Sequence, residues 1–307
     1  MSKSPTYVDK KARNTQVGDL QVEPHRVIDA REQKRAYTYS TCEQSKIISE
    51  TVKDTLVKNS KHMSAAEWFE EWFDSPYYHI LYKNRDESEA EDFIDRLLET
   101  LAPRPGARIL DLACGRGRYS RHLAEKGFDV TGLDLSVQSI AFARQFEHGN
   151  LSFFTHDMRL PFRTNYFDYV FNFFTSFGYF ENEKDDIKTL RNVAVGLRPE
   201  GVFVLDFFNS AYVIQRLTGS EEKEVDGIRF KLNKRIEGRH VVKTIDFQDQ
   251  GRSWHFEERV RLFTPEDFRR IFGAAGLHIQ KAYGDYQLQP FHPENSPRLI
   301  LVAQQNH

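Results

Sequence analysis

Cysteine is scarce in this chain of 307 residues, because Cys42 and Cys114 are its only two thiols. Two cysteines cannot build a disulfide framework. Charge of one sign is also lacking: the formal net charge is -2 at pH 7, which argues against a broad electrostatic surface for nucleic acid. No apolar stretch approaches membrane-spanning length, and the opening residues hold no hydrophobic signal core. These absences favour a soluble cytoplasmic protein that binds no membrane.

The stretch that organises the chain is Arg108–Ser120, which reads RILDLACGRGRYS. Its apolar run from Ile109 to Leu112 is too short for a helix and predicts a strand buried on both faces. A glycine turn follows, and the pattern from Arg118 to Lys126 predicts a helix that Gly127 ends. Strand, glycine turn and helix in this order predict the nucleotide-binding corner of an open α/β sheet.

One charge favours a cationic ligand at this corner. Gly115 and Gly117 match the start of a dinucleotide fingerprint, but Ser120 stands where the third glycine would be. Asp111 lies just upstream of the turn, where its carboxylate would repel a phosphate. A ligand with an adenosine end, an ammonium group and a sulfonium fits this field better than a dinucleotide.

The pattern D-x-x-C-G-x-G, from Asp111 to Gly117, resembles motif I of the class I S-adenosylmethionine-dependent methyltransferases. The resemblance extends from about Trp68 to the C-terminus. It implies S-adenosylmethionine as cofactor, with no metal, and a seven-stranded Rossmann-like α/β sheet whose last strand is antiparallel. It also implies cofactor contacts along the turn, at Asp111, Ala113, Cys114, Gly115 and Gly117.

Two further strand ends are expected to contact the cofactor. Asp134 follows Asp111 by 23 residues and ends the next predicted strand, a spacing at which a carboxylate accepts both ribose hydroxyls. Leu135 is placed to cover an adenine face, and Ser136 is a predicted helix cap. By resemblance, Asp157 takes the adenine amino group and the backbone amide of Met158 reads the ring.

The segment before the turn is predicted to cover the cofactor. By resemblance, Tyr82 and Arg85 meet the methionine carboxylate, and the forked guanidinium of an arginine suits that group. Helix-capping and core roles are the alternatives for these two residues. Ser75-Pro76 is expected to end a short aromatic helix ahead of them.

The sequence indicates the residues that bind the methyl acceptor less specifically than those that bind the cofactor. Asn172 stands where enzymes that methylate exocyclic amines carry an Asn/Asp-Pro-Pro-aromatic motif, but the prolines are missing, which disfavours DNA adenine and protein glutamine as acceptors. Asp206 marks the end of the fifth strand. Alternating segments after Ser220 predict a three-stranded antiparallel meander. By resemblance to small-molecule methyltransferases, this insert covers the acceptor, and His255, Glu258 and Asp206 are candidate catalytic contacts.

The sequence therefore predicts two parts: a flexible or appended extension over residues 1–62, and a methyltransferase domain over 63–307. Within the domain, residues 63–105 form cofactor-covering helices and 221–262 the meander insert. The predicted activity is methyl transfer to a nitrogen or oxygen of a small-molecule acceptor. An RNA or tRNA methyltransferase, an NAD(P)-dependent oxidoreductase and a non-catalytic nucleoside-binding module are the alternatives.

Overall fold

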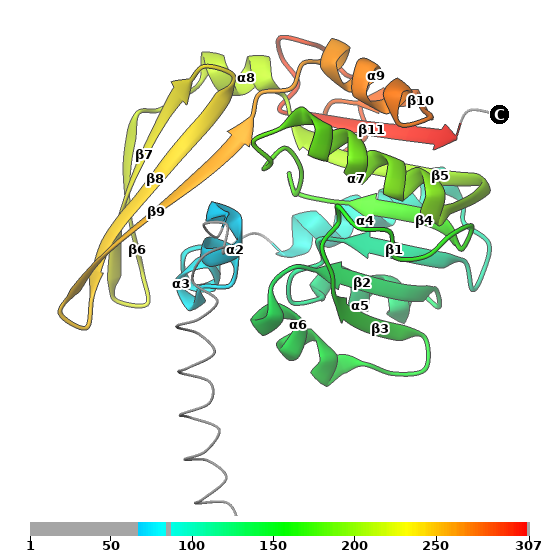
Figure 1. Ribbon diagram of the computed structural model, residues 1–307, viewed down its shortest axis with the longest axis horizontal. Coiled ribbons are helices and arrows are strands. Elements are labelled where there is room, and N and C mark those ends of the chain that lie inside the picture. Colours follow the sequence, from blue (N-terminus) through cyan, green and yellow to red (C-terminus); the bar gives the residue numbers. More distant parts are fainter. Residues whose placement is uncertain (1–66, 84–86, 306–307) are drawn as a thin grey trace, which may run out of the picture. The chain divides into compact units, whose positions relative to one another are not determined.

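The structure is a computed structural model that describes residues 67–83 and 87–305. All of these residues belong to one unit, Ala65–His307, which is centred on a seven-stranded sheet (Figure 1). The strand order is β10-β11-β5-β4-β1-β2-β3. Strands β1 to β5 run parallel, whereas β11 is antiparallel to its neighbours β5 and β10. This arrangement confirms the predicted sheet with its antiparallel last strand.

The strands of this sheet are β1 (Arg108–Leu112), β2 (Asp129–Asp134), β3 (Leu151–Thr155), β4 (Phe167–Asn172), β5 (Leu197–Phe208), β10 (Leu277–Tyr283) and β11 (Arg298–Gln305). Its helices are α4 (Glu87–Leu101), α5 (Arg118–Glu125), α6 (Val137–Ala143) with the short 3-10 turn η1 (Arg144–Phe146), α7 (Glu183–Gly196), α8 (Ser210–Gln215) and α9 (Pro265–Ala274). The predicted strand and helix around the glycine turn therefore coincide with β1 and α5.

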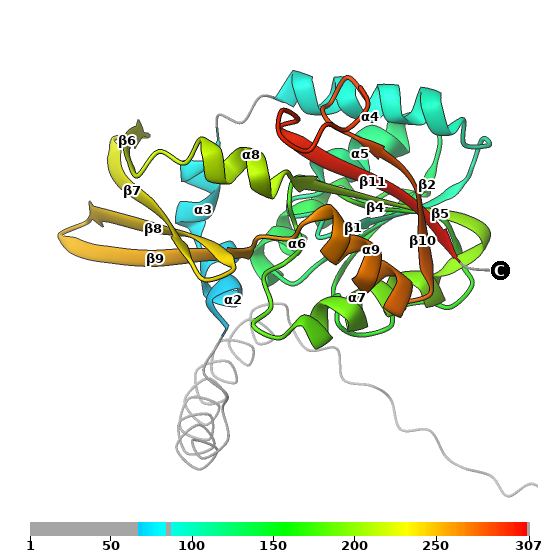
Figure 2. The same ribbon diagram turned by 90° about the horizontal axis from the view of Figure 1, so that it is seen from above.

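Helices cover both faces of the sheet, as the two largest groups of buried side chains show. Helices α4, α5 and α6 pack on one face through Phe93, Leu123 and Ile140, whereas α7 and α9 pack on the other (Figure 2). Because both faces are covered, the central strands are largely buried, and in β1 every residue from Ile109 to Leu112 is buried, Asp111 included. The edge that stays open to ligand is the row of carboxyl ends.

A second sheet follows β5 in the chain and corrects the prediction of a three-stranded meander. It has four antiparallel strands in the order β6-β7-β8-β9 (Figure 1). The additional strand is β6 (Ser220–Val225), which pairs with β7 (Ile228–Glu237), and β8 (His240–Asp249) and β9 (Arg252–Arg261) complete the sheet. The sequence of β6, SEEKEV, has no apolar alternation, because this edge strand buries only Val225.

Two short helices cover the inner face of the second sheet. In α2 (Trp68–Phe73), Trp72 is fully buried, with its ring centroid 4.7 Å from that of Phe256 on β9. Helix α3 (Pro76–Leu81) begins where the sequence predicted only a helix end. Ser75 caps it by accepting from the Tyr77 N–H, and Pro76 occupies its first turn, where no N–H is needed. Ser75-Pro76 therefore separates two helices.

The predicted extension over residues 1–62 lies outside the described residues, so its character stays a prediction. Within the described part of the chain, no helix is long and apolar enough to cross a membrane.

Replacing Gly117 tests how tightly the turn after β1 is packed. Its φ is 72°, and a Cβ there would lie 2.4 Å from the ring of Phe153. Gly117→Ala should lower the free energy of unfolding by about 1–2 kcal/mol for the left-handed backbone and by roughly a further 1–3 kcal/mol for overpacking. Gly127 is the matched control, because its φ is 90° but nothing lies within 4 Å. Equal losses in both variants by urea denaturation would show that Phe153 moves aside freely.

Candidate functional site

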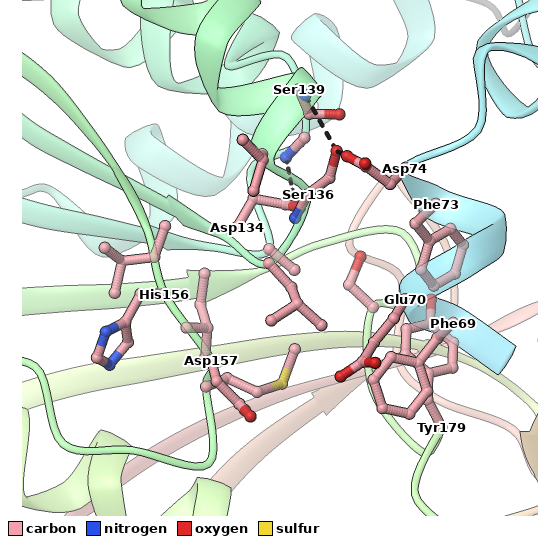
Figure 3. A pocket seen from close by; sticks show the side chains of 18 of the residues that line it. Phe69, Glu70, Phe73, Asp74, Asp134, Ser136, Ser139, His156, Asp157 and Tyr179 are labelled. Atoms are coloured by element: carbon pink, nitrogen blue, oxygen red, sulfur yellow. Dashed lines mark hydrogen bonds between the residues drawn. The ribbon is translucent and has the colours of Figure 1, made fainter. Parts of the chain in front are cut away.

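Two adjoining cavities open at the carboxyl ends of the parallel strands, where sheets of this kind bind ligands. The first cavity, of about 340 Å³, lies between α2 and the ends of β2 and β3 (Figure 3). The second cavity, of about 640 Å³, extends from the glycine turn to the second sheet. They share the residues Phe73, Tyr78, Ala113, Gly115, Ser176 and Tyr179. The two cavities therefore meet at the glycine turn.

Along the turn after β1, every second residue has a left-handed backbone. Ala113, Gly115 and Gly117 have φ values of 64°, 55° and 72°. Gly115 lines both cavities, and a Cβ there would meet nothing within 4 Å. Gly117 lines neither cavity, and its missing side chain makes room for Phe153 instead. Of the two motif glycines, Gly115 is thus the one whose backbone a ligand can approach.

Asp134 connects the end of β2 to this turn. Its Oδ2 accepts a hydrogen bond of 2.8 Å from the Gly115 N–H, and its Oδ1 accepts one of 2.8 Å from the Ser136 N–H. Burial raises the pKa of Asp134, although both backbone N–H groups favour the charged form. The carboxylate is therefore fixed in orientation at the wall of the first cavity, with lone pairs left for further donors.

Asp111 is buried behind the same turn and lines the second cavity. Burial raises its pKa to about 7, and the nearby charge of Asp134 adds to the shift, although the Ser120 hydroxyl donates a hydrogen bond of 2.6 Å to its Oδ2. No cation pairs with Asp111 within residues 67–83 and 87–305. A positive charge bound at the turn would stabilise its ionised form.

The adenine-binding predictions fall in the first cavity. Leu135 and Met158 both line it. Asp157 lines it as well and is labelled in Figure 3. Burial alone would raise the pKa of Asp157, but side-chain and backbone hydrogen bonds from Arg159 outweigh burial and lower it. Arg159 also forms an ion pair of 2.6 Å with Glu67. Asp157 is thus a charged acceptor held by Arg159, and its contact with adenine stays a prediction.

Tyr82 and Glu258 meet in the second cavity. The Tyr82 hydroxyl and the Trp72 indole N–H both donate to Glu258 Oε1, over 2.6 and 2.7 Å. Lys243 on β8 forms an ion pair of 2.5 Å with the other Glu258 oxygen. Burial opposes ionisation of Glu258, but the charge of Lys243 and these hydrogen bonds lower its pKa. This cluster joins α2, the end of α3, β8 and β9.

Two of the weaker predictions are placed away from both cavities. The side chain of His255 is 63% exposed and contacts Asp246 over 2.6 Å. Since His255 and Glu258 are three residues apart on one strand, they face opposite sides of the sheet, and only Glu258 faces the cavity. Asp206 is fully buried, where it pairs with Arg298 over 2.7 Å and accepts from the Phe174 N–H. In this structure Asp206 therefore caps the loop that follows β4.

Asn172 and Arg85 are two further residues for which a cofactor contact is predicted. The Asn172 side chain is buried and lines neither cavity; its amide donates to the carbonyl oxygens of Leu112 and Ser176. It therefore joins the end of β1 to the loop after β4, and its contact with the cofactor stays a prediction. Arg85 lies outside the described residues, and Cys114 lines the second cavity as a buried thiol whose pKa burial raises.

Sequence reasoning missed most of the wall that α2 and α3 contribute. Phe69, Phe73 and Tyr78 line the first cavity, and Asp74 accepts hydrogen bonds from the Ser136 hydroxyl and the Gln138 N–H. The aromatic stripe of α2 was visible in the sequence. Which of its rings face a ligand and which pack on the second sheet depends on contacts with segments more than 100 residues away.

The residues present fit S-adenosylmethionine. Asp134 offers oriented carboxylate oxygens for a ribose diol, Leu135 and Met158 offer apolar surface, and the open space at Gly115 admits a ligand close to the backbone. Asp111 supplies a buried acid for a cationic centre. Three features together define the class I S-adenosylmethionine-dependent methyltransferases: the strand order of the sheet, the glycine turn after β1, and an acidic residue at the end of β2.

Comparison with known proteins agrees with this class. A family model described as a methyltransferase domain matches residues 82–282. YqeM of Bacillus subtilis (strain 168), provisionally named a methyltransferase, is 30% identical over 220 residues, 68% of this chain and 88% of that protein. The dTDP-3-amino-3,6-dideoxy-alpha-D-glucopyranose N,N-dimethyltransferase of Streptomyces fradiae is 30% identical over 191 residues, 57% of this chain and 71% of that protein.

Among solved structures, an S-adenosylmethionine-dependent methyltransferase from Clostridium acetobutylicum ATCC 824 shares the fold. Its TM-score is 0.64 at 21% identity, covering 75% of this chain and 96% of that one. The chain thus belongs to the methyltransferase-domain family, and it is an S-adenosylmethionine-dependent enzyme.

Replacing Asp134 tests the predicted ribose contact. Asp134→Ala should weaken binding of S-adenosylhomocysteine by about 1–3 kcal/mol, because hydrogen bonds to the ligand and the orientation of Gly115 are both lost. Calorimetric titration measures the change. Asp129, at the opposite end of the same strand, is the matched control, and Asp129→Ala should bind as the unaltered protein does. Unchanged affinity in Asp134→Ala would contradict the assignment.

The raised pKa of Asp111 predicts a pH dependence of binding. Because a cationic ligand favours the carboxylate, the pKa of Asp111 should fall on binding, and affinity should increase as pH rises through about 7. Titrations with S-adenosylmethionine, which carries the sulfonium charge, between pH 6 and 8.5 measure this slope. Asp111→Asn keeps an acceptor for Ser120 but cannot ionise, so its affinity should be lower at pH 8 and its slope smaller. An identical slope in both proteins would assign the titration to another group.

Proposed function

We propose that the enzyme transfers a methyl group to an amine nitrogen of a small molecule bound in the second cavity. The observation that carries this proposal is the position of that cavity, which adjoins the first cavity at Gly115 and ends against the second sheet. Its volume of about 640 Å³ lies in the range of small-molecule sites, roughly 300–1,000 Å³. A pocket of this size favours a metabolite over an RNA duplex.

A nitrogen acceptor is supported by two considerations. The Streptomyces fradiae relative is named an N,N-dimethyltransferase of an amino sugar. The second cavity is also lined by many aromatic side chains, among them Tyr78, Tyr119 and Phe174. Aromatic faces attract cations, so they suit an amine and its methylated products better than a hydroxyl.

The cofactor, when bound, supplies a methyl group that is already activated by its positively charged sulfur. The chain's own residues then have to hold donor and acceptor in line. On the donor side, Asp134 and the Gly115 backbone would orient the ligand. On the acceptor side, the hydrogen-bonded cluster of Tyr82, Lys243 and Glu258 forms a polar wall of fixed geometry. Such positioning contributes on the order of 7–11 kcal/mol at best.

Glu258 is a poor candidate for a general base. Its pKa is lowered, and its oxygens already accept from Lys243, Tyr82 and Trp72. A carboxylate so well stabilised has little driving force to take a proton. An amine that enters in its neutral form needs no base before it attacks, which is a further reason to prefer nitrogen over a hydroxyl as the acceptor.

Methyl transfer from tritiated S-adenosylmethionine tests this function. We expect label in amine-bearing metabolites, with amino sugar nucleotides and free amino acids as the first panels, and none in their hydroxyl counterparts or in bulk tRNA. The Asp134→Ala variant serves as the control for cofactor-dependent transfer. Label that enters only RNA, or only hydroxyl compounds, would overturn the proposal.

A further inference from the structure

The second cavity carries an excess of positive charge. Its lining includes six cationic side chains against two carboxylates, in a chain whose net charge is -2. The cations are Lys83, Arg116, Arg118, Arg121, Lys234 and Lys243, and the acids are Asp111 and Glu258. His79 adds no charge near neutral pH, because burial lowers its pKa to about 4. The imbalance of four charges is thus concentrated at this cavity.

Ion pairs account for the three lysines. Lys243 pairs with Glu258, Lys83 pairs with Asp226 over 2.9 Å, and Lys234 pairs with Glu221 over 3.3 Å. Arg116 and Arg121 differ, since neither makes an ion pair within residues 67–83 and 87–305. They stand on the glycine turn and on α5, at the edge where the cavity reaches α6.

Two phenyl rings hold these arginines in place. The guanidinium carbon of Arg116 lies 4.8 Å from the ring centroid of Phe142, and that of Arg121 lies 4.2 Å from that of Phe146. The two rings are themselves 5.6 Å apart. Stacking on a ring fixes the plane of a guanidinium and leaves its N–H edges available. The Nε of Arg121 is buried without a hydrogen-bond partner.

An arginine pair of this kind suits a phosphoryl group. Guanidinium N–H groups bind phosphate oxygens in a bidentate manner, and such charge-assisted bonds are the strong ones. Burial lowers the pKa of Arg116, so the free protein holds this cation at a cost that a bound anion would remove. Asp226 and Glu221, which lie outside the lining, offset two of the four charges, so the excess that remains is that of the arginines. Two arginines with no carboxylate partner among the described residues favour a multivalent anion over a single carboxylate.

We infer that the acceptor is a phosphorylated amine, whose phosphoryl group binds the arginine pair Arg116 and Arg121 while its amine lies beside Gly115, where the two cavities meet. This inference rests on the proposed function, because it names the class of acceptor for the same cavity. It assigns the arginine pair to substrate selection and not to the cofactor.

Titration of the full chain with inorganic pyrophosphate tests the inference, with and without saturating S-adenosylhomocysteine. We expect binding in both cases, and a loss of about tenfold or more in the variants Arg116→Gln and Arg121→Gln. Arg229 is the matched control, because it lies on β7 outside the cavity and pairs with Glu224 on the surface. Arg229→Gln should bind as the unaltered protein does. Thermal unfolding of each variant checks that it is folded.

Several results would overturn the inference. One is pyrophosphate that does not bind, that binds the two variants as well as the control, or that binds no better than acetate. Another is a loss of S-adenosylhomocysteine affinity in the variants with 5'-methylthioadenosine affinity unchanged, since the pair would then bind the cofactor's carboxylate. If cofactor binding is unchanged but pyrophosphate does not bind, the inference about the acceptor is rejected and the proposed function is not. Failure of methyl transfer to any amine would reject the proposed function.

Discussion

The hydrogen bond from the Gly115 N–H to the Asp134 carboxylate fixes the point on which both cavities depend. It joins the turn after β1 to the end of β2, and Asp134 also accepts from Ser136 at the start of α6. A backbone that alternates left-handed residues has no regular hydrogen-bond ladder of its own. The charged acceptor supplies that missing partner, and it does so with the same oxygens that face the first cavity.

Carboxylates also hold α2 and α3, the two short helices that cover the site. Asp74, at the end of α2, accepts from the Ser136 hydroxyl and the Gln138 N–H at the start of α6. Its negative charge lies at the positive end of a helix. On the other side, Trp72 and Tyr82 donate to Glu258 on the second sheet. Carboxylates thus attach α2 and α3 on both sides, to α6 and to the second sheet, and aromatic side chains pack between these two attachments.

Much of this arrangement could be predicted from the sequence, because it is encoded locally. The apolar run of β1, the helix cap Ser136 and the acid 23 residues beyond Asp111 can each be recognised from their immediate neighbours. Strand β6 was not predicted, because an exposed edge strand needs no apolar face and therefore shows no alternation of apolar and polar residues. The choice between His255 and Glu258 could have been narrowed by strand parity, but the face that meets the cavity depends on long-range packing.

Local strain is concentrated at the second cavity. Ala113, Phe174 and Thr175 line it with φ values of 64°, 58° and 65°, although none is glycine. Asp206 and Arg298 hold the last two residues, since Asp206 accepts from the Phe174 N–H and Arg298 donates to the Thr175 hydroxyl. Backbone strain persists only where the surroundings over-determine it, and it clusters at sites that bind ligands. The fully buried Asp206 therefore acts on the second cavity from behind its wall, because it shapes a loop that lines the cavity.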